Sequence, residues 1–405
     1  MNLTKGSSLY DGFMQVASEA CPYFKNWTYD MPLVLSGETN YRLHKIQNIM
    51  YRVIRYFVEH YNEYRHLMPV TDRIYEIVSL CRKKPYRIGT YRTDFIIDEK
   101  NDLKLIEITC RFALNGYFIS GFFNMMTDNY LKDKPNIRKI DDYTPFFDYI
   151  IGYFGEFKHV CLLKGEDSKN ETKFLIPIIE NAGFKLHVIP KDCIIDNLHL
   201  LKDAAVISEL DHNEICGLPN EAIEAIIESC SLNDLRTVFL VHDKRLFSVL
   251  GNKDLLQAVL TQDEIEQFIN ITVTTYTRQE RPDLWEKAKM EKDKWIIKPC
   301  ALGKGINVFA GCVTSEHEWQ QVFSSDLIDN MILQPFITQR KFSGSIGDNR
   351  YNDYVVGTLL FFDDNYFGPG LFRASSYPVT NKVDDRKLAP LVTFDTTYFD
   401  NSIIL

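Results

Sequence analysis

The first part of the chain repeats its apolar residues with the spacing of an amphipathic helix. Between positions 40 and 68, one face of such a helix would collect Ile46, Ile49, Met50, Val53, Ile54, Phe57 and Val58. A period of about 3.6 residues is typical of a helix that packs one side against a core. Thr71 or Asp72 can cap a further helix that runs to Leu80. We expect residues 10–84 to form a helical layer that covers a sheet.

The segment after this helical region instead alternates apolar and polar residues with a period of two. Residues 91–98 alternate as a strand, residues 99–102 are turn formers, and residues 103–109 are the returning strand of a predicted β-hairpin. After His159, strand-like runs alternate with helical ones. The expected strands are 159–163, 184–189, 204–207 and 237–241, and the expected helices are 172–182 and 220–229. This alternation predicts a small doubly wound α/β unit, and without a GxGxxG motif it does not support dinucleotide binding.

The last third of the chain has a mixed α+β pattern. Its most informative stretch, 295–308, is interpreted as a buried strand ending in Lys298, a turn, a glycine-flanked lysine loop and a second strand. The polar segment 342–348 is interpreted as a mobile lid or substrate loop. Further strands are expected at 331–334, 355–362 and 371–373.

These patterns predict a protein of class α+β / α/β in three parts. Residues 1–157 would hold the helical layer and the hairpin, with the hairpin at 87–111. Residues 158–245 would form the small α/β unit, and residues 246–405 would surround the glycine loop.

Composition narrows the class of protein. The 405 residues carry a net charge of −9, which argues against a protein that coats nucleic acid. The nine cysteines form no CxxC pair and no zinc pattern, as expected of reduced thiols in the cytoplasm. The sequence shows neither a signal peptide nor a run of about 18 apolar residues, so we expect no membrane segment.

The glycine loop is a candidate anion site. Gly303 and Gly305 would let backbone N–H groups approach a polyphosphate, and Lys298 and Lys304 would supply positive charge. No Gly-Lys-Ser/Thr sequence opens a helix here, so this is not a Walker P-loop. A simple hairpin turn is the structural alternative.

The hairpin is a candidate metal site. On a strand, Arg92 and Asp94 share a face, as do Glu107 and Thr109. Two carboxylates beside a hydroxyl are the usual protein share of a Mg²⁺–nucleotide site. The alternative is a cross-strand salt bridge from Arg92 to Glu107. Elsewhere, we interpret His242 with Asp243 as a strand end and helix cap rather than a catalytic pair.

The order of these motifs resembles that of the circularly permuted ATP-grasp ligases, typified by the synthetase part of glutathionylspermidine synthetase. The matching segments are Arg92-Thr93-Asp94, Glu107-Ile108-Thr109, Lys253 with Lys298, Gly303-Lys304-Gly305, Gln334, and Arg373 with Val379-Thr380-Asn381. Thr109 stands where that group has an asparagine metal ligand. No amidase domain precedes the matching region, so only the ligase part is suggested.

The resemblance implies ATP and Mg²⁺ as cofactors and a site between two α+β subdomains, with the 158–245 unit as its pre-ATP-grasp-like part. It implies a ligase that joins a carboxylate to an amine through an acyl phosphate, with small amino-acid, peptide or polyamine-like substrates. The implied metal ligands are Asp94, Glu107 and Thr109. The implied nucleotide contacts are Lys253, Lys298, Gly303, Lys304, Gly305, Gln334 and Phe336. Arg92, Arg373 and Lys304 would act on the transferred phosphoryl group.

Two other functions stay open at this point. The chain could bind ATP or a partner without turnover, which the Thr109 substitution favours. It could also be a phosphotransferase that stops at a phosphorylated product. Release of ADP that requires both an acid and an amine would distinguish the ligase from both.

Overall fold

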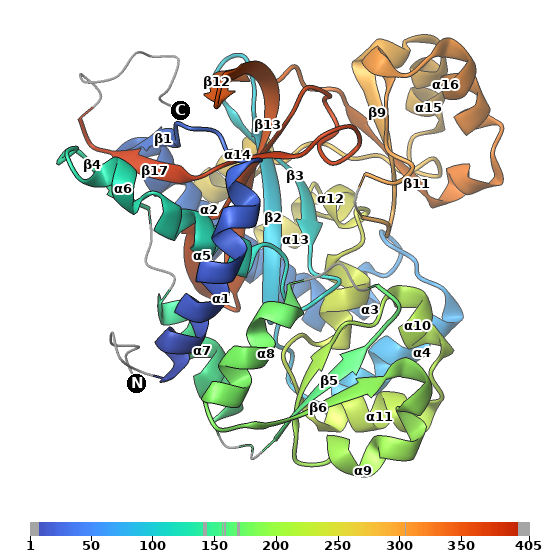
Figure 1. Ribbon diagram of the computed structural model, residues 1–405. Coiled ribbons are helices and arrows are strands. Elements are labelled where there is room, and N and C mark those ends of the chain that lie inside the picture. The colour runs from blue at the N-terminus through green and yellow to red at the C-terminus, as the bar shows by residue number, and fades with distance from the viewer. Residues whose placement is uncertain are drawn as a thin grey trace.

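A seven-stranded sheet is the centre of the computed structural model, which describes residues 8–140, 144–155, 157, 159–167, 171–303 and 305–395. Its strands run in the order β16-β15-β13-β2-β3, and β12 and β14 also pair with β13 (Figure 1). The bounds are β2 (Thr90–Ile97), β3 (Leu103–Thr109), β12 (Lys341–Ile346), β13 (Asn349–Phe362), β14 (Asn365–Pro369), β15 (Phe372–Ser375) and β16 (Arg386–Leu388). The predicted hairpin is therefore present, and its first strand pairs with a strand from the last part of the chain.

Helices cover both faces of this sheet because β13 is apolar on both sides. Leu359 and Phe361 join the core that contains α2 (Gly37–Glu59), whereas Leu360 and Phe362 join the core that contains α5 (Tyr117–Met126). Such alternation follows from the period of two along a strand. The helical layer expected at 10–84 is found in α2 and in α4 (Asp72–Leu80), which Thr71 caps, but Leu33–Ser36 within this range forms a strand, β1.

The predicted α/β unit contains a parallel sheet of order β6-β5-β7-β8, seen at the lower right of Figure 1. Its elements are β5 (His159–Lys164), α8 (Thr172–Asn181), β6 (Lys185–Pro190), β7 (Ala205–Ser208), α11 (Asn220–Glu228) and β8 (Cys230–Ser231). The prediction of a strand at 237–241 is wrong: Thr237–Val241 forms a fully buried π-helix, η4. A short apolar run between buried layers does not distinguish strand from helix by periodicity.

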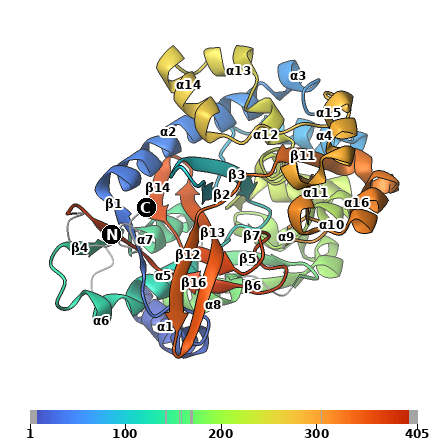
Figure 2. The ribbon, with the colours of Figure 1, turned by 90° about the horizontal axis from the view of Figure 1, so that it is seen from above.

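A small lobe carries the lysine-bearing strand. Its antiparallel sheet has the order β10-β9-β11 and packs on α15 (Pro282–Met290) and α16 (Glu316–Phe323) through a core that includes Trp285 and Trp319. Both ribbon views show this lobe standing out from the central sheet (Figures 1 and 2). The strands are β9 (Trp295–Pro299), β10 (Phe309–Ala310) and β11 (Met331–Pro335).

Two further predictions need correction. The strand expected to end at Val308 begins at Phe309, after a longer loop. The segment 342–348 is not a loop, because most of it lies in β12 and pairs residue by residue with β13 from Lys341↔Tyr354 to Ile346↔Asn349. Its glycine and serines resemble a loop in composition, but cross-strand pairing with β13 decides its conformation.

A last sheet of order β1-β17-β4 joins both ends of the described chain, with β1 (Leu33–Ser36), β4 (Ile137–Lys139) and β17 (Pro390–Thr393). The remaining helices are α1 (Ser8–Lys25), α3 (Tyr61–Tyr64), α6 (Asp128–Leu131), α7 (Thr144–Phe154), α9 (Leu198–Leu201), α10 (His212–Gly217), α12 (Leu246–Val249), α13 (Lys253–Gln257) and α14 (Gln262–Ile271). Within the described ranges, no helix combines the length and the apolar character that crossing a bilayer needs.

Candidate functional site

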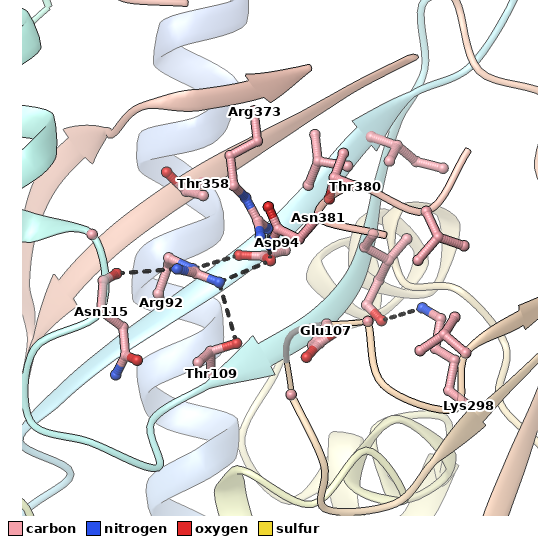
Figure 3. A pocket seen from close by; sticks show the side chains of 18 of the residues that line it. Arg92, Asp94, Glu107, Thr109, Asn115, Lys298, Thr358, Arg373, Thr380 and Asn381 are labelled. Atoms are coloured by element: carbon pink, nitrogen blue, oxygen red, sulfur yellow. Dashed lines mark hydrogen bonds and ion pairs between the residues drawn. The ribbon is translucent and has the colours of Figure 1, made fainter. Parts of the chain in front are cut away.

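A cavity of about 370 Å³ lies between the central sheet and the small lobe. Residues of the hairpin β2–β3, of β9 and β11, and of the segment around β15 and β16 all line it. Figure 3 shows side chains from these separate parts of the chain pointing toward one another. Among the predicted site residues within the described ranges, all but Lys253 line this cavity.

The two acidic residues stand directly opposite each other in the hairpin. Asp94 pairs with Glu107 and Arg92 pairs with Thr109. Directly opposed residues in an antiparallel pair share a face, with Cβ atoms about 5 Å apart. A bulge follows Asp94 and leaves Ile106 as the extra residue of β3. The Ile106 carbonyl accepts a hydrogen bond from Lys298 Nζ at 3.4 Å, so the hairpin and the small lobe meet here.

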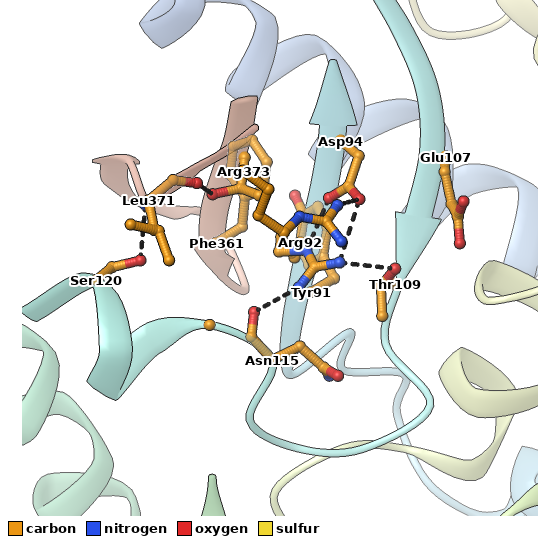
Figure 4. A network of polar contacts seen from close by, with 12 residues as sticks. Tyr91, Arg92, Asp94, Glu107, Thr109, Asn115, Ser120, Phe361, Leu371 and Arg373 are labelled. Atoms are coloured by element: carbon orange, nitrogen blue, oxygen red, sulfur yellow. Dashed lines mark hydrogen bonds and ion pairs between the residues drawn. The ribbon is translucent and has the colours of Figure 1, made fainter. Parts of the chain in front are cut away.

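Two arginines hold Asp94. Arg92 donates through Nε and Nη2 to the two carboxylate oxygens at 2.7 and 3.1 Å, and Arg373 pairs with Oδ2 (Figure 4). Burial alone would raise the pKa of the Asp94 carboxyl, but Arg92 and Arg373 outweigh it and hold that pKa below its usual value. The carboxylate is therefore ionised. The alternative salt bridge from Arg92 to Glu107 is not formed, because Arg92 faces Asp94 and reaches Thr109 Oγ1 at 3.5 Å.

Lys298 is a buried cation that lacks a close counter-charge. Its exposed fraction is 5%, and the acceptor found for it in the described part of the chain is the Ile106 carbonyl. Burial lowers its pKa to about 8, and Lys244 contributes to this, while Glu107 and Asp94 act in the opposite direction. A buried ammonium in this condition fits a polyphosphate, which would supply the missing negative charge.

Lys244 provides the second cavity lysine that the sequence analysis assigned to Lys253. Lys253 lies exposed in the first turn of α13 and does not line the cavity. Lys244 is 2% exposed, lies 3.3 Å from Glu107 Oε1 and donates to the Leu302 carbonyl at 2.5 Å. The interpretation of His242 with Asp243 as a strand end and helix cap is wrong, because η4 precedes them and the N-cap of α12 is Arg245. Their polar run into Lys244 was the signal that could have identified this lysine.

The glycine loop reaches the cavity at Gly303 and Gly305, while Lys304 lies outside the described residues. Gly305 has φ +69°, a conformation that a side chain disfavours. A Cβ atom at this position would lie 3.4 Å from Val379 and 3.5 Å from the Thr380 carbonyl. The loop therefore packs on the segment that follows β15.

Gln334 and Phe336, which the resemblance implies as nucleotide contacts, also line the cavity. Gln334 Nε2 donates to Thr275 Oγ1 at 2.8 Å, and the Phe336 N–H donates to the Lys294 carbonyl at 2.7 Å. An amide nitrogen carries two N–H groups, so this hydrogen bond uses only one of the donors of Gln334.

The sequence analysis also missed a network behind Arg373. With its amide nitrogen toward Asp385 at 2.8 and 2.9 Å, Asn381 accepts from Arg373 Nη1 at 2.9 Å. Asp385 also pairs with Lys387, which lies opposite Arg373 in the sheet. Burial lowers the pKa of Lys387, Asp385 opposes this, and the cations Arg373 and Arg92 add to the lowering.

Glu171 closes the end of the cavity beyond Arg92. Its carboxylate accepts from the N–H groups of Gly116, Phe118 and Ile119 at 2.8, 3.3 and 3.3 Å, where α5 begins. Burial raises the pKa of Glu171 although these hydrogen bonds favour the ionised form. Asn115, whose carbonyl accepts from Arg92 Nη1 at 3.3 Å, lines the same end.

Known proteins resemble this chain in sequence and in structure. A family model described as the AnkG N-terminal domain matches residues 44–240. The "ATP-grasp enzyme ankG" of Aspergillus thermomutatus is 24% identical over 192 residues, which are 43% of this chain and 40% of that protein. The match thus spans less than half of the curated relative.

A solved structure is similar over nearly the whole chain. It is a glutathione synthetase like-effector (GSS30) from Globodera pallida in the apoform, with a TM-score of 0.59 and 10% identity, covering 96% of this chain and 98% of that one. These likenesses agree with the prediction of an ATP-grasp-like fold. The finer resemblance to glutathionylspermidine synthetase and the permuted order stay predictions.

Proposed function

We propose that this chain is an ATP-dependent ligase that joins a small carboxylic acid to an amine. The observation that carries the proposal is the single cavity in which an acidic pair from the first third of the chain faces buried lysines and a glycine loop from the last two thirds. That combination of charges suits a nucleotide whose phosphates lie between a divalent cation and fixed positive groups.

Asp94 and Glu107 would hold Mg²⁺, and the Thr109 hydroxyl would either bind the ion or hold a water molecule. The pair fits a hard cation in chemistry and register, although no group of three or more His, Cys, Asp or Glu residues suited to a metal occurs in the described part of the chain. Phosphate oxygens and water would complete the coordination. The metal would neutralise charge on the phosphates.

The cations that now pair with these carboxylates would turn to the phosphates. Lys244 would leave Glu107 and, with Lys298, contact the nucleotide phosphates under the glycine loop. Arg92 and Arg373 would both turn from Asp94 and bind the transferred phosphoryl group, for which the arginine fork is suited. The acid would take the phosphoryl group to give an acyl phosphate and ADP, and an amine would then displace phosphate.

The nine unpaired cysteines are consistent with a cytoplasmic location.

A coupled assay tests the proposal: ADP and phosphate should be released only when ATP, Mg²⁺, an acid and an amine are all present. Amino acids, short peptides and polyamines form the panel. Glu107→Gln should abolish release, whereas Lys253→Gln should leave it unchanged, because Lys253 lies outside the cavity. Release that needs neither acid nor amine would refute the ligase.

A second candidate is a protein that binds ATP without turnover. Two observations favour it: Arg92 and Arg373 both form ion pairs with Asp94, and Thr109 stands where the related ligases have an asparagine metal ligand. Tight nucleotide binding without ADP release from any acid–amine pair would select this function. A stable phosphorylated acid would instead indicate a phosphotransferase.

A further inference from the structure

His242 is a buried side chain that makes no hydrogen bond of good geometry to the described residues, although the Ile108 backbone lies close enough to affect its pKa. It follows η4, is 1% exposed and lines the cavity. Within the described residues, neither Nδ1 nor Nε2 reaches a group in hydrogen-bonding geometry. The His212 ring meets it edge-on at 5.4 Å, while His212 Nε2 contacts the Val238 carbonyl. An imidazole in this position lacks the partners that buried polar groups normally have.

The charges around His242 are positive. Burial holds its pKa well below the usual value, and His212, Lys244 and Arg111 add to this, while the backbone of Ile108 opposes it. The ring is therefore neutral, with one N–H to donate. A cationic ligand end placed here would meet the like charges of Lys244 and Arg111, whose own partners Glu107 and Asp167 each already hold one cation.

Arg111 extends the row of polar residues along the cavity floor. It follows Glu107 and Thr109 at a spacing of two and lines the same cavity. Its ion pair with Asp167, at 3.2 Å, is made by one nitrogen of its fork, and its guanidinium lies 4.3 Å from the Phe112 ring centroid. At about 3.3 Å per residue, Arg111 is at most about 13 Å along the chain from Glu107.

We propose that Arg111 and His242 form a subsite for a carboxylate at the end of a substrate remote from the phosphates. This inference rests on the proposed ligase function, and it adds a substrate class: either the amine is an amino acid, or the acid carries a second carboxylate. Arg111 supplies a charge-assisted donor, and His242 supplies a neutral N–H that makes no hydrogen bond of good geometry within the described residues. A substrate with a neutral or cationic end, such as a polyamine, would leave both groups unmatched.

NMR titration of the full chain tests the subsite. The His242 imidazole signal is identified by its loss in His242→Phe, which keeps a ring of similar volume. The probes are acetate and two matched pairs, L-alanine with L-alaninamide and succinate with butyrate, each used with and without Mg²⁺ and a non-hydrolysable ATP analogue. Acetate should shift the signal saturably. L-Alanine should bind more tightly than L-alaninamide if the amine is an amino acid. Butyrate should respond as acetate does, and in the presence of Mg²⁺ and the ATP analogue succinate should bind more tightly than butyrate if the acid carries a second carboxylate.

Variants separate this inference from the proposed function. Arg111→Gln should weaken carboxylate binding by about tenfold or more, Arg111→Lys should weaken it less, and Lys253→Gln should not change it. Nucleotide affinity should stay the same in all three. A signal that no carboxylate moves would mean that water alone satisfies His242, and this would overturn the subsite. Equal response to both members of each pair, or an unchanged response in a folded Arg111→Gln, would also overturn it. A carboxylate response without nucleotide binding would refute the ligase and leave the subsite intact.

Discussion

Replacing Lys298 by methionine should stabilise the nucleotide-free protein and impair nucleotide binding. Folding lowers the pKa of Lys298 from an ordinary 10.5 to about 8 because the ammonium is buried. At about 1.36 kcal/mol per pKa unit, holding the charged form in the folded state costs about 3 kcal/mol at neutral pH. Methionine is an unbranched side chain that fits a lysine-shaped space and removes this charge.

The pH dependence gives the sign of the effect. Because the unfolded chain keeps the Lys298 proton up to higher pH than the folded chain, wild-type stability should rise as pH increases from about 8 toward 10.5. Below about pH 8 the full penalty applies. The advantage of Lys298→Met should therefore be largest at pH 7, up to about 3 kcal/mol, and should shrink at alkaline pH.

Urea unfolding of both proteins at pH 7 and pH 9.5, followed by fluorescence, measures the stability difference. Calorimetric titration with ATP and Mg²⁺ measures the loss of affinity, which we expect to be at least about tenfold because a charge-assisted contact is removed. A methionine variant less stable than wild type at pH 7, or a stability difference independent of pH, would show that Lys298 already has a counter-charge. Unchanged ATP affinity would remove Lys298 from the nucleotide site.

Three further substitutions test other parts of the structure. Glu107→Gln should lose Mg²⁺-dependent nucleotide binding while its melting temperature stays close to wild type, and an unchanged Mg²⁺ response would exclude Glu107 as a ligand. Arg373→Ala should lower turnover more than ATP affinity, since this side chain is assigned to the transferred group; a selective loss of affinity would contradict that role. Asp353→Asn should destabilise the fold by about 3 kcal/mol, because the buried carboxylate binds Arg386 at 2.5 and 2.8 Å and accepts from the Tyr29 hydroxyl at 2.6 Å. Chemical unfolding measures that loss, and a stability equal to wild type would contradict the buried pair.

Local patterns predicted the hairpin well, because alternation and turn residues act within a few positions. The pairing of β2 with β13 joins residues about 260 apart, and no local pattern predicts such a register. The error at η4 has a related cause: a buried apolar run looks the same whether the surrounding layers make it a strand or a helix.

The choice between Lys253 and Lys244 shows the same limit within the site. Both lysines follow an aspartate or asparagine in a helix-rich segment, and spacing alone does not say which side chain enters a cavity. Burial decides between them, and burial depends on how the segment packs against β3. For the same reason Arg111 was not singled out and His242 was interpreted only as part of a strand end and helix cap, since their place in one cavity depends on tertiary packing.

From the ion pairs of the proposed site, we expect metal and nucleotide to bind with positive coupling. A divalent cation alone must displace Lys244 from Glu107, and both Arg92 and Arg373 from Asp94, with no phosphates to receive them. If nucleotide binds alone and draws these cations to its phosphates, Asp94 and Glu107 lose their positive partners and lie close to the phosphate charges. When both are bound, the metal pairs with the two carboxylates and the phosphates pair with the displaced lysine and arginines. Each ligand should therefore raise the affinity of the other by the same factor.

Calorimetric titrations with Mg²⁺, in the presence and absence of a non-hydrolysable ATP analogue, measure this coupling. The titration data are corrected for the Mg²⁺ that the free analogue itself binds. We expect a coupling of at least about tenfold, within the range of about 1–3 kcal/mol usual for linked sites. Glu107→Gln should reduce the coupling, because it removes the carboxylate at which the metal would replace Lys244. Lys253→Gln should preserve the coupling. Independent binding of metal and nucleotide in the wild-type protein would mean that the cations never leave Asp94 and Glu107, and the exchange would be refuted.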